Sequence, residues 1–247
     1  MCASFPSQNQ GLLPLREGVV ENSIYKFCAV IGVTCSFWGG DVYAAGAESA
    51  LDLLDAPVAY SATYRASDGK GVFSGKVWHE PGRERRDFET KSGDQSVLLR
   101  RDNDSAYLMK PSGKWYVAVG FHAALSLAGG FDGMSVSRQK VGPDSVEGQN
   151  STRFHITANT KDGRGFVGDL WSLASGIPVK VEGVETEPTG KKTQVSLIQT
   201  NIIAGPIEAG RLDVPQGYMG INLKTVSAEN LNQAIQSITP LLNGGKK

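Results

Sequence analysis

The chain has 247 residues, of which 40% are hydrophobic and 20% are charged. This length and composition exclude a mainly disordered protein and allow one sizeable hydrophobic core. Its 25 basic and 25 acidic residues balance. A chain without a net basic field has no general affinity for phosphate, so we expect no nucleic acid partner.

The N-terminal region resembles a secretory leader. Residues 27–40 form an uncharged run after Lys26, and small residues follow at 42–47. The run is shorter than the ~20 apolar residues that span a bilayer. We therefore expect residues 1–47 to be a leader that is cleaved after Ala44 or Ala47. The polar stretch 1–18 is long for a leader, so we expect the true start near Val19 or Val20.

All three cysteines, Cys2, Cys28 and Cys35, precede the expected cleavage site. The mature chain would then form no disulfide, which favours a bacterial periplasmic protein over a disulfide-stapled extracellular module. Lipoprotein processing is less favoured, because Phe27 and Thr34 stand where a small residue is preferred. Two basic and three acidic residues precede Ala44, so the mature chain carries about one positive charge.

Short segments of alternating character follow the leader. Residues 47–54 are expected to form a helical turn. Alternation of large and small or polar side chains, with glycine, proline and aspartate turns between, then predicts six strands without a helix. These strands are 58–65, 72–80, 83–90, 95–101, 106–110 and 114–119.

A short helix is predicted at 121–128, because Phe121, Leu125 and Ala128 have helical spacing and two glycines end the run. Further strands are predicted at 134–141, 152–158, 165–171, 178–185 and 193–203. The last segment, 227–242, is predicted to be an amphipathic helix with Ser227 as N-cap and Glu229 in its first turn. This helix is expected either to dock on the domain or to face a membrane.

The chain shows no pattern of catalytic or metal-binding residues. His79, His122 and His155 share no spacing that suits a metal, and each is expected to be a surface or hydrogen-bonded histidine. The segment 102–104 lacks the glycine and distal glutamate of a calcium loop and is expected to be a tight turn. No nucleophile or phosphate-loop motif is present. We expect no enzyme, no cofactor and no metal.

Two side-chain sets are candidates for binding. Arg83, Arg85 and Arg86 could hold a phosphate or a lipid headgroup. The interleaved acids Glu84, Asp87 and Glu89 instead favour a solvated, self-paired strand face.

The second set is apolar and could line one concave sheet face closed by the helix at 121–128. Its strand members could equally be ordinary core, which is the favoured interpretation for them. The set consists of Trp78, Leu98, Leu108, Trp115, Phe121, Leu125, Phe131 and Trp171.

Between about residues 58 and 218 the chain resembles the periplasmic lipoprotein-carrier superfamily (LolA/LolB-like), and more closely its uncharacterised periplasmic relatives. The resemblance depends on the strand order and on three segments. These are Val141-Gly142 followed by Val146-x-Gly148 and Thr152, Asp169-Leu-Trp171 followed by Gly176-Ile-Pro-Val-Lys180, and Leu212-Asp-Val-Pro215-x-Gly-Tyr218.

The resemblance implies a mainly β fold, in which a curved antiparallel sheet forms an unclosed half-barrel covered by a few helices. The domain would span 48–225, with the C-terminal helix and tail at 226–247. The resemblance further implies a carrier or chaperone that binds a lipid or a lipoprotein acyl chain. An envelope sensor or protein-interaction module that uses the same sheet is the alternative. Peripheral contact with a membrane is left open.

Overall fold

The structure is a computed structural model, and it describes residues 48–49, 55–69, 71–90, 93–127, 135–160 and 163–242. The expected leader at 1–47, with its cleavage sites, lies outside the described residues. Of the segment 47–54, the structure describes Glu48–Ser49, which form a short strand rather than a helical turn.

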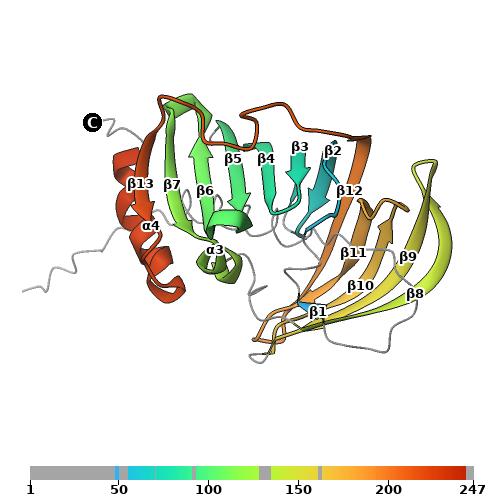
Figure 1. The fold of residues 1–247 in the computed structure, drawn as a ribbon. Coiled ribbons are helices and arrows are strands. Elements are labelled where there is room, and N and C mark those ends of the chain that lie inside the picture. Colours follow the sequence, from blue (N-terminus) through green and yellow to red (C-terminus); the bar gives the residue numbers. More distant parts are fainter. Residues whose placement is uncertain are drawn as a thin grey trace, which may run out of the picture.

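Strands make up most of the described chain (Figure 1). In chain order they are β1 (Glu48–Ser49), β2 (Tyr60–Ser67), β3 (Val72–Glu80), β4 (Arg83–Thr90), β5 (Gly93–Arg100), β6 (Ser105–Lys110), β7 (Trp115–Gly120), β8 (Ser135–Val146), β9 (Gln149–Asn159), β10 (Gly165–Ser172), β11 (Pro178–Thr186), β12 (Lys192–Ala204) and β13 (Met219–Leu223). The helices of the described residues are α3 (Phe121–Leu127) and α4 (Ala228–Leu242), with short 3₁₀ turns at Arg101–Asn103 and Pro111–Gly113.

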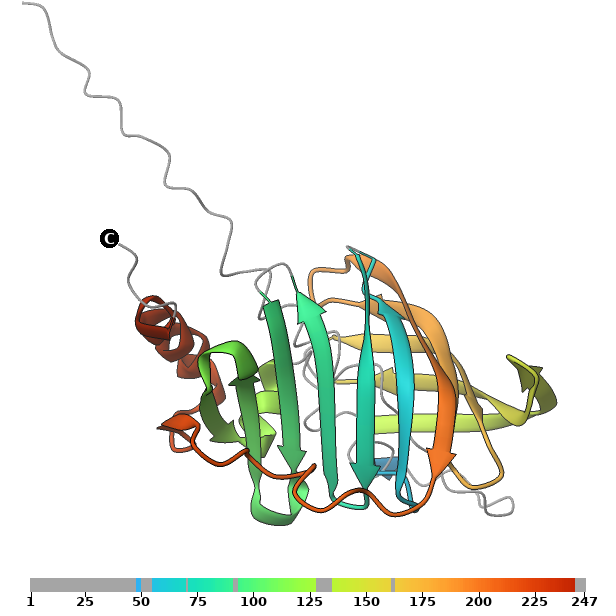
Figure 2. The same cartoon turned by 90° about the horizontal axis from the view of Figure 1, so that it is seen from above.

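All these strands belong to one 13-stranded sheet in the order β1-β8-β9-β10-β11-β12-β2-β3-β4-β5-β6-β7-β13. Because β12 pairs with β2, the first long strand lies in the middle and the chain builds one wing on each side of it. The two wings turn steeply toward each other, and the two end strands of the described sheet do not pair (Figures 1 and 2). The expected mainly β fold with a curved, unclosed antiparallel sheet is confirmed.

The sheet has an inner face, which we define as the one that carries Tyr60, Tyr64 and Ala66 of β2. The buried core on this face combines residues of both wings, such as Val117 and Leu170, with residues of both helices. α3 contacts α4, β6 and β7, and α4 lies on the inner side of β13 (Figure 2). The helices and the two wings therefore share one core.

A second, smaller core lies on the outer face. Residues 205–218, here called the outer strap, connect β12 to β13 and cross the outer face of the β2–β7 wing (Figure 2). Leu212 of the strap packs against Leu98 and Met109. The Arg211 guanidinium lies 4.9 Å from the centre of the Trp78 ring, and Arg100 donates to Asp213 at 2.9 Å.

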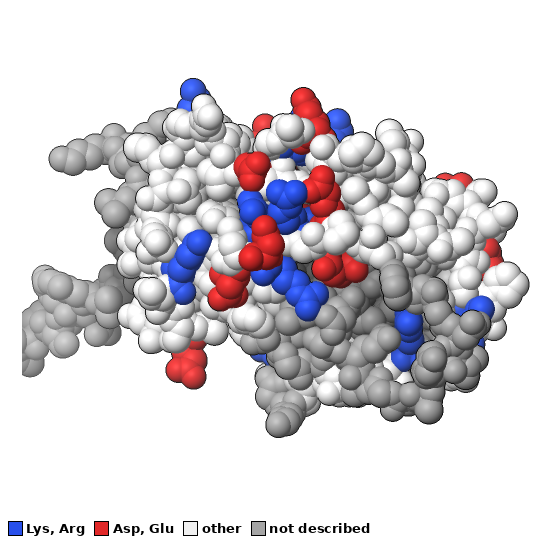
Figure 3. Space-filling view, viewed as in Figure 1, with Lys and Arg blue, Asp and Glu red and all other residues white. Residues whose placement is uncertain are grey.

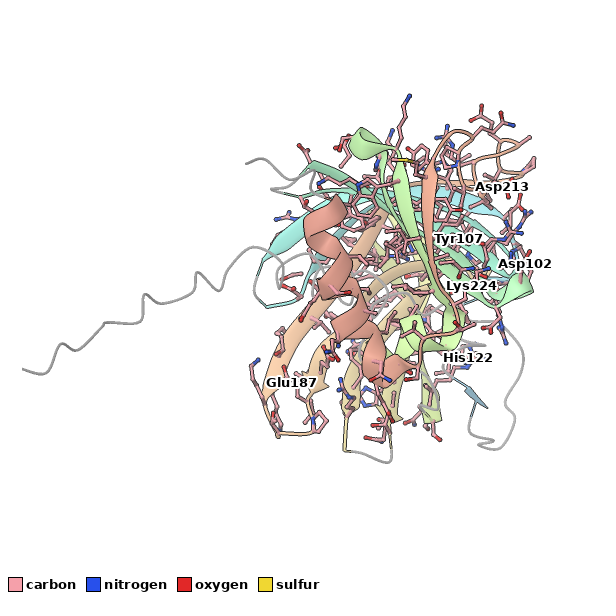
Figure 4. All side chains as sticks on the ribbon, turned by 90° about the vertical axis from the view of Figure 1, so that its left-hand side faces the viewer. Asp102, Tyr107, His122, Glu187, Asp213 and Lys224 are labelled. Atoms are coloured by element: carbon pink, nitrogen blue, oxygen red, sulfur yellow. The ribbon has the colours of Figure 1, made fainter. Side chains whose placement is uncertain are left out.

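Charges on this outer side are intermixed rather than separated by sign (Figure 3). Asp102 and Asp213 flank Arg100, and the Lys224 ammonium lies 5.4 Å from the centre of the Tyr107 ring (Figure 4). Pairs of this kind at the surface add little stability, and they present no field of one sign to a partner.

The structure extends the sequence expectations in two places. β8 continues to Val146, past the predicted end at 141, through an irregularity between Lys140 and Gly142. β13, which sequence patterns did not predict, pairs in parallel with β7. It follows the outer strap. Met219, Ile221 and Leu223 alternate with Gly220 and Asn222, but the pattern covers only five residues, most of them exposed.

The helix predictions at 121–128 and 227–242 are confirmed within one residue. α4 is docked, since Leu231 and Ile235 are buried in the inner core. The Ser227 hydroxyl accepts a hydrogen bond from the side chain of Asn230 at the helix start. No helix among the described residues is both long and apolar enough to cross a membrane.

Candidate functional site

The structure divides the eight apolar residues predicted to line one concave face. Leu108, Trp115, Phe121 and Leu125 belong to the inner core. Trp78 and Leu98 belong to the core beneath the outer strap, and Trp171 belongs to a third cluster on the outer face of the other wing. Phe131 lies outside the described residues.

The register of the sheet explains this division. Val77 and His79 pair with the inward residues Ala62 and Tyr60, so Trp78 between them points outward. The expectation of one shared face is therefore wrong for Trp78, Leu98 and Trp171. A ligand contact by the four inner residues stays a prediction.

On the outer face, the indole N–H and the ring of Trp171 are both in contact with other side chains of the protein. Its indole N–H donates to Asp144 at 2.7 Å. Its ring lies between two cations, with the Arg153 guanidinium 5.3 Å and the Lys180 ammonium 4.5 Å from the ring centre. Val179 packs against it. These contacts hold β8 to β11 together and leave little of the ring for a ligand.

The inner face instead holds a set of buried polar side chains. We call it the inner polar cluster, and it consists of Tyr64 on β2, His79 on β3, Glu84 and Arg86 on β4, and Gln199 on β12. The register brings them onto one face, because Gln199 pairs with Tyr64, His79 with Glu84, and Arg86 with Val77. The strands that join both wings therefore carry polar groups in the middle of an apolar face.

Three of these side chains form a hydrogen-bonded chain. Arg86 Nε donates to Glu84 Oε1 at 2.7 Å, and His79 Nδ1 lies 3.3 Å from Glu84 Oε2. His79 Nε2 lies 2.9 Å from the carbonyl oxygen of Ala56. Both partners of the imidazole are acceptors, so the ring fits this site with a proton on each nitrogen.

The charges of the cluster support the same protonation state. Burial alone would lower the pKa of His79, but the hydrogen bond and the negative charge of Glu84 raise it above its usual value. Burial alone would raise the pKa of Glu84, but Arg86 and His79 lower it to about 2. Asp55, 3.7 Å from His79, supplies a second negative charge. The two cations are thus balanced by two carboxylates.

Tyr64 and Gln199 differ from these three residues. The Arg86 guanidinium lies 5.2 Å from the centre of the Tyr64 ring. The Tyr64 hydroxyl lies over Gly75 of β3, so that a Cβ atom on Gly75 would be only 2.9 Å from the hydroxyl oxygen. Within the described chain, neither this hydroxyl nor either polar atom of the Gln199 amide has a hydrogen-bond partner, although all three atoms are buried. Such groups are rare in folded proteins and call for a partner.

The sequence predicted the environment of the charged residues on β4 only in part. The expected pairing of Glu84 and Asp87 with arginines is present. The expected solvation is wrong, since Glu84, Arg85 and Arg86 are all buried. A signal existed: strand alternation places Glu84 and Arg86 on the same side as Phe88.

The histidines do not gather into one site. His79 is buried and hydrogen-bonded, His155 on the outer face lies 3.1 Å from Asp169, and His122 is an exposed residue of α3. Within the described ranges, no group of three or more histidine, cysteine, aspartate or glutamate residues could hold a metal ion.

No protein-family model matches the sequence, and no curated protein matches it. The fold is similar to solved structures of low sequence identity. An uncharacterized conserved protein from Thermus thermophilus is 11% identical with a TM-score of 0.46, and the match covers 67% of this chain and 91% of that protein.

Two further similar structures come from Pseudomonas aeruginosa and Mycobacterium tuberculosis. The MucA/MucB complex gives a TM-score of 0.40 at 14% identity, over 66% of this chain and 57% of the matched chain. The lipoprotein LppX gives 0.36 at 12% identity, over 62% of this chain and 88% of LppX. This chain thus spans just over half of the matched chain in the MucA/MucB complex. Similarities of this size concern the course of the backbone and transfer no ligand or partner.

Proposed function

We propose that this protein binds a lipid or another acyl-chain ligand between the inner face of its sheet and helices α3 and α4, and acts as a carrier or chaperone rather than as an enzyme. The proposed location is the periplasm, in keeping with the leader-like N-terminal sequence. The inner face supports this proposal by its composition, because it is apolar across both wings and is covered in part by two helices that lie outside the sheet.

The single observation that carries the proposal is the buried amide of Gln199. Leaving a buried polar group without a partner costs about 1–3 kcal/mol, so a protein that folds for stability alone would place an apolar residue there. A ligand that enters the inner face could supply the missing partner and recover that free energy. The inner polar cluster therefore fits a binding site better than a purely structural core.

The experiment is to express the chain with its leader, purify the exported protein from the periplasm and extract bound lipid for mass spectrometry. We expect a stoichiometric acyl-chain compound. We also expect dodecanoyl ligands to raise the melting temperature of delipidated protein by several degrees. Protein that carries no lipid and ignores every acyl-chain ligand would contradict the proposal.

A protein-interaction module is the second candidate, and the free edge of β8 favours it. Among the described residues, β8 meets β1 only at Ser135 and Val136, and its remaining outer edge has no strand beside it. Val141 on this edge is 58% exposed. An extended peptide could add to such an edge through backbone hydrogen bonds. One protein that co-purifies in a 1:1 ratio, without lipid, and is lost on Gly142→Pro would favour this function instead.

A further inference from the structure

We propose that the buried Gln199 amide, on the inner face that it shares with the Tyr64 hydroxyl, is a recognition site for a neutral amide group on an acyl-chain ligand. This inference rests on the proposed function and names the chemical class of the ligand. It predicts that the protein prefers an acyl chain that ends in a primary amide over the corresponding ester or free acid.

The first support is the position of Gln199 on its strand. It follows the buried residues Val195 and Leu197 on the inward side of β12 and is itself 0% exposed. Its Nε2 and Oε1 atoms both lack a hydrogen-bond partner among the residues that the structure describes. Gln194, on the outward side of the same strand, is exposed to water. Only the inward glutamine therefore needs a partner that water does not readily supply.

The second support is another unpartnered polar group on the same face. Tyr64 is the direct cross-strand partner of Gln199, and side chains in this relation have Cβ atoms about 4.5–5.5 Å apart. Burial raises the pKa of Tyr64, although Arg86 opposes the shift. The side chain thus stays a neutral hydroxyl, which reaches over Gly75 of β3 and can donate or accept one further hydrogen bond on the same inner face.

The third support is the charge of the surroundings. Arg86 is the nearest cation to this pair for which the structure gives a contact, and it is bound to Glu84 at 2.7 Å. Glu84 is shared in turn with His79. The positive charges are thus already balanced, and the site offers no net charge to a phosphate or a carboxylate. A neutral polar group suits it better.

An amide matches the unpartnered atoms more completely than an ester does. A primary amide has its C=O and one N–H on the same side, so it can accept from Gln199 Nε2 and donate to Gln199 Oε1 at the same time. An ester has acceptors only, so it would satisfy Nε2 and leave Oε1 buried without a donor. Leaving one buried group unpaired weakens binding by about tenfold.

The residues beside Tyr64 on β2 are small. Ala62 and Ala66 flank it on the inner face and are both buried. They place little side-chain volume along β2 on either side of Tyr64. Because Gln199 is fully covered, a ligand reaches it only when the parts of the chain that cover the inner face move aside.

The experiment measures the affinity of the delipidated full chain for three probes with the same chain length. They are dodecanamide, methyl dodecanoate and dodecanoate, titrated by calorimetry below their solubility limits and critical micelle concentrations. We expect the amide to bind about tenfold more tightly than the ester and more tightly than the carboxylate.

The decisive variant is Gln199→Met, which keeps the length of the side chain and removes both polar atoms. It should bring the amide-to-ester affinity ratio close to one and should leave the ligand-free melting temperature unchanged or higher, because the orphaned atoms are gone. Gln194→Met is the matched control on the outer face of the same strand. It should keep the amide preference of the original chain.

The outcomes separate this inference from the proposed function. If all three probes bind with equal affinity, the amide site is refuted and the ligand-binding function stands. If no probe binds, the ligand-binding function fails as well. If Gln199→Met weakens all three probes alike and lowers the melting temperature, Gln199 has a structural role, and the amide site is refuted.

Discussion

Glu84 and Arg86 lie two positions apart on β4, so both side chains point into the inner core. Their ion pair is 2.7 Å long, and both residues are buried. A buried pair of this kind adds little net stability compared with apolar residues, but removal of one partner strands the other charge. The pair therefore constrains which substitutions β4 tolerates.

Glu84→Gln should destabilise the protein by about 3–5 kcal/mol, because it leaves the Arg86 guanidinium buried without a carboxylate. Urea unfolding followed by circular dichroism measures the change. The matched control is Glu182→Gln, which breaks a pair with Lys180 whose glutamate side chain is 43% exposed. We expect the control to cost under about 1 kcal/mol, and equal costs for the two variants would contradict the buried ion pair.

The same residues predict how stability depends on pH. The pKa of Glu84 is lowered from 4.5 to about 2 in the folded protein, so its contribution is present above pH 4.5 and is lost as the pH falls toward 2. The pKa of His79 is raised from 6.5, so its contribution is present below pH 6.5 and is lost as the pH rises through the folded value.

We therefore expect the free energy of unfolding to be highest between about pH 4.5 and 6.5. Urea titrations from pH 3 to pH 9 measure this profile. Glu84→Gln should flatten the acid side, and His79→Gln should flatten the alkaline side. A wild-type profile that rises steadily from pH 6.5 to 9 would count against a protonated His79.

At the scale of elements, β10 and β11 approach each other closely at a pair of glycines. Gly168 and Gly183 are direct cross-strand partners. A Cβ atom on Gly183 would lie 2.5 Å from the Val167 carbonyl oxygen and 2.6 Å from Phe166 Cζ. The absence of side chains at both positions lets the Phe166 ring lie across the inner face of this wing.

Gly183→Ala should therefore destabilise the protein by about 1–3 kcal/mol, since backbone and ring must both shift. Gly71→Ala serves as the control, because a Cβ at Gly71 meets no atom of the described chain within 4 Å. Thermal unfolding followed by circular dichroism distinguishes the two variants. A Gly183→Ala protein as stable as the control would mean that β10 and β11 adapt without strain.

At the scale of the whole molecule, α4 closes one end of the inner face. Leu231 is fully buried in the core that both wings share, while its neighbour Asn232 is exposed. The helix reaches this position only after the outer strap and β13 have brought the chain around the edge of the sheet. Docking of α4 therefore depends on contacts with strands and with α3, which lie much earlier in the sequence.

Leu231→Asp should undock α4, because a carboxylate cannot be buried there without a partner. We expect the sheet signal in circular dichroism to persist and the fluorescence of a hydrophobic dye such as ANS to rise severalfold as the apolar inner surface is exposed. Asn232→Asp, which adds the same charge on the exposed side, should leave dye binding unchanged. Complete loss of the sheet signal in Leu231→Asp would show that α4 is integral to the fold.

Much of the fold could be predicted from local patterns. The turns at 68–71 and 81–82 identified the starts of β3 and β4 to the residue, because glycine and proline mark the ends of strands. α3 and α4 were recognisable from helical spacing of apolar residues. β13 was not predicted, because its alternating pattern covers only five residues and its partner β7 lies about a hundred residues earlier.

The sequence by itself determined the strands, their alternation and the two helices, because these follow from near neighbours along the chain. Only the tertiary structure decided which side of each strand faces inward, since that depends on the register with strands distant in sequence. Trp78 and Gln199 make the difference plain. Trp78 moved from an expected ligand site to the contact with Arg211 under the outer strap. Gln199, which the sequence did not single out within its predicted strand, lies on the inner face beside the middle strand β2.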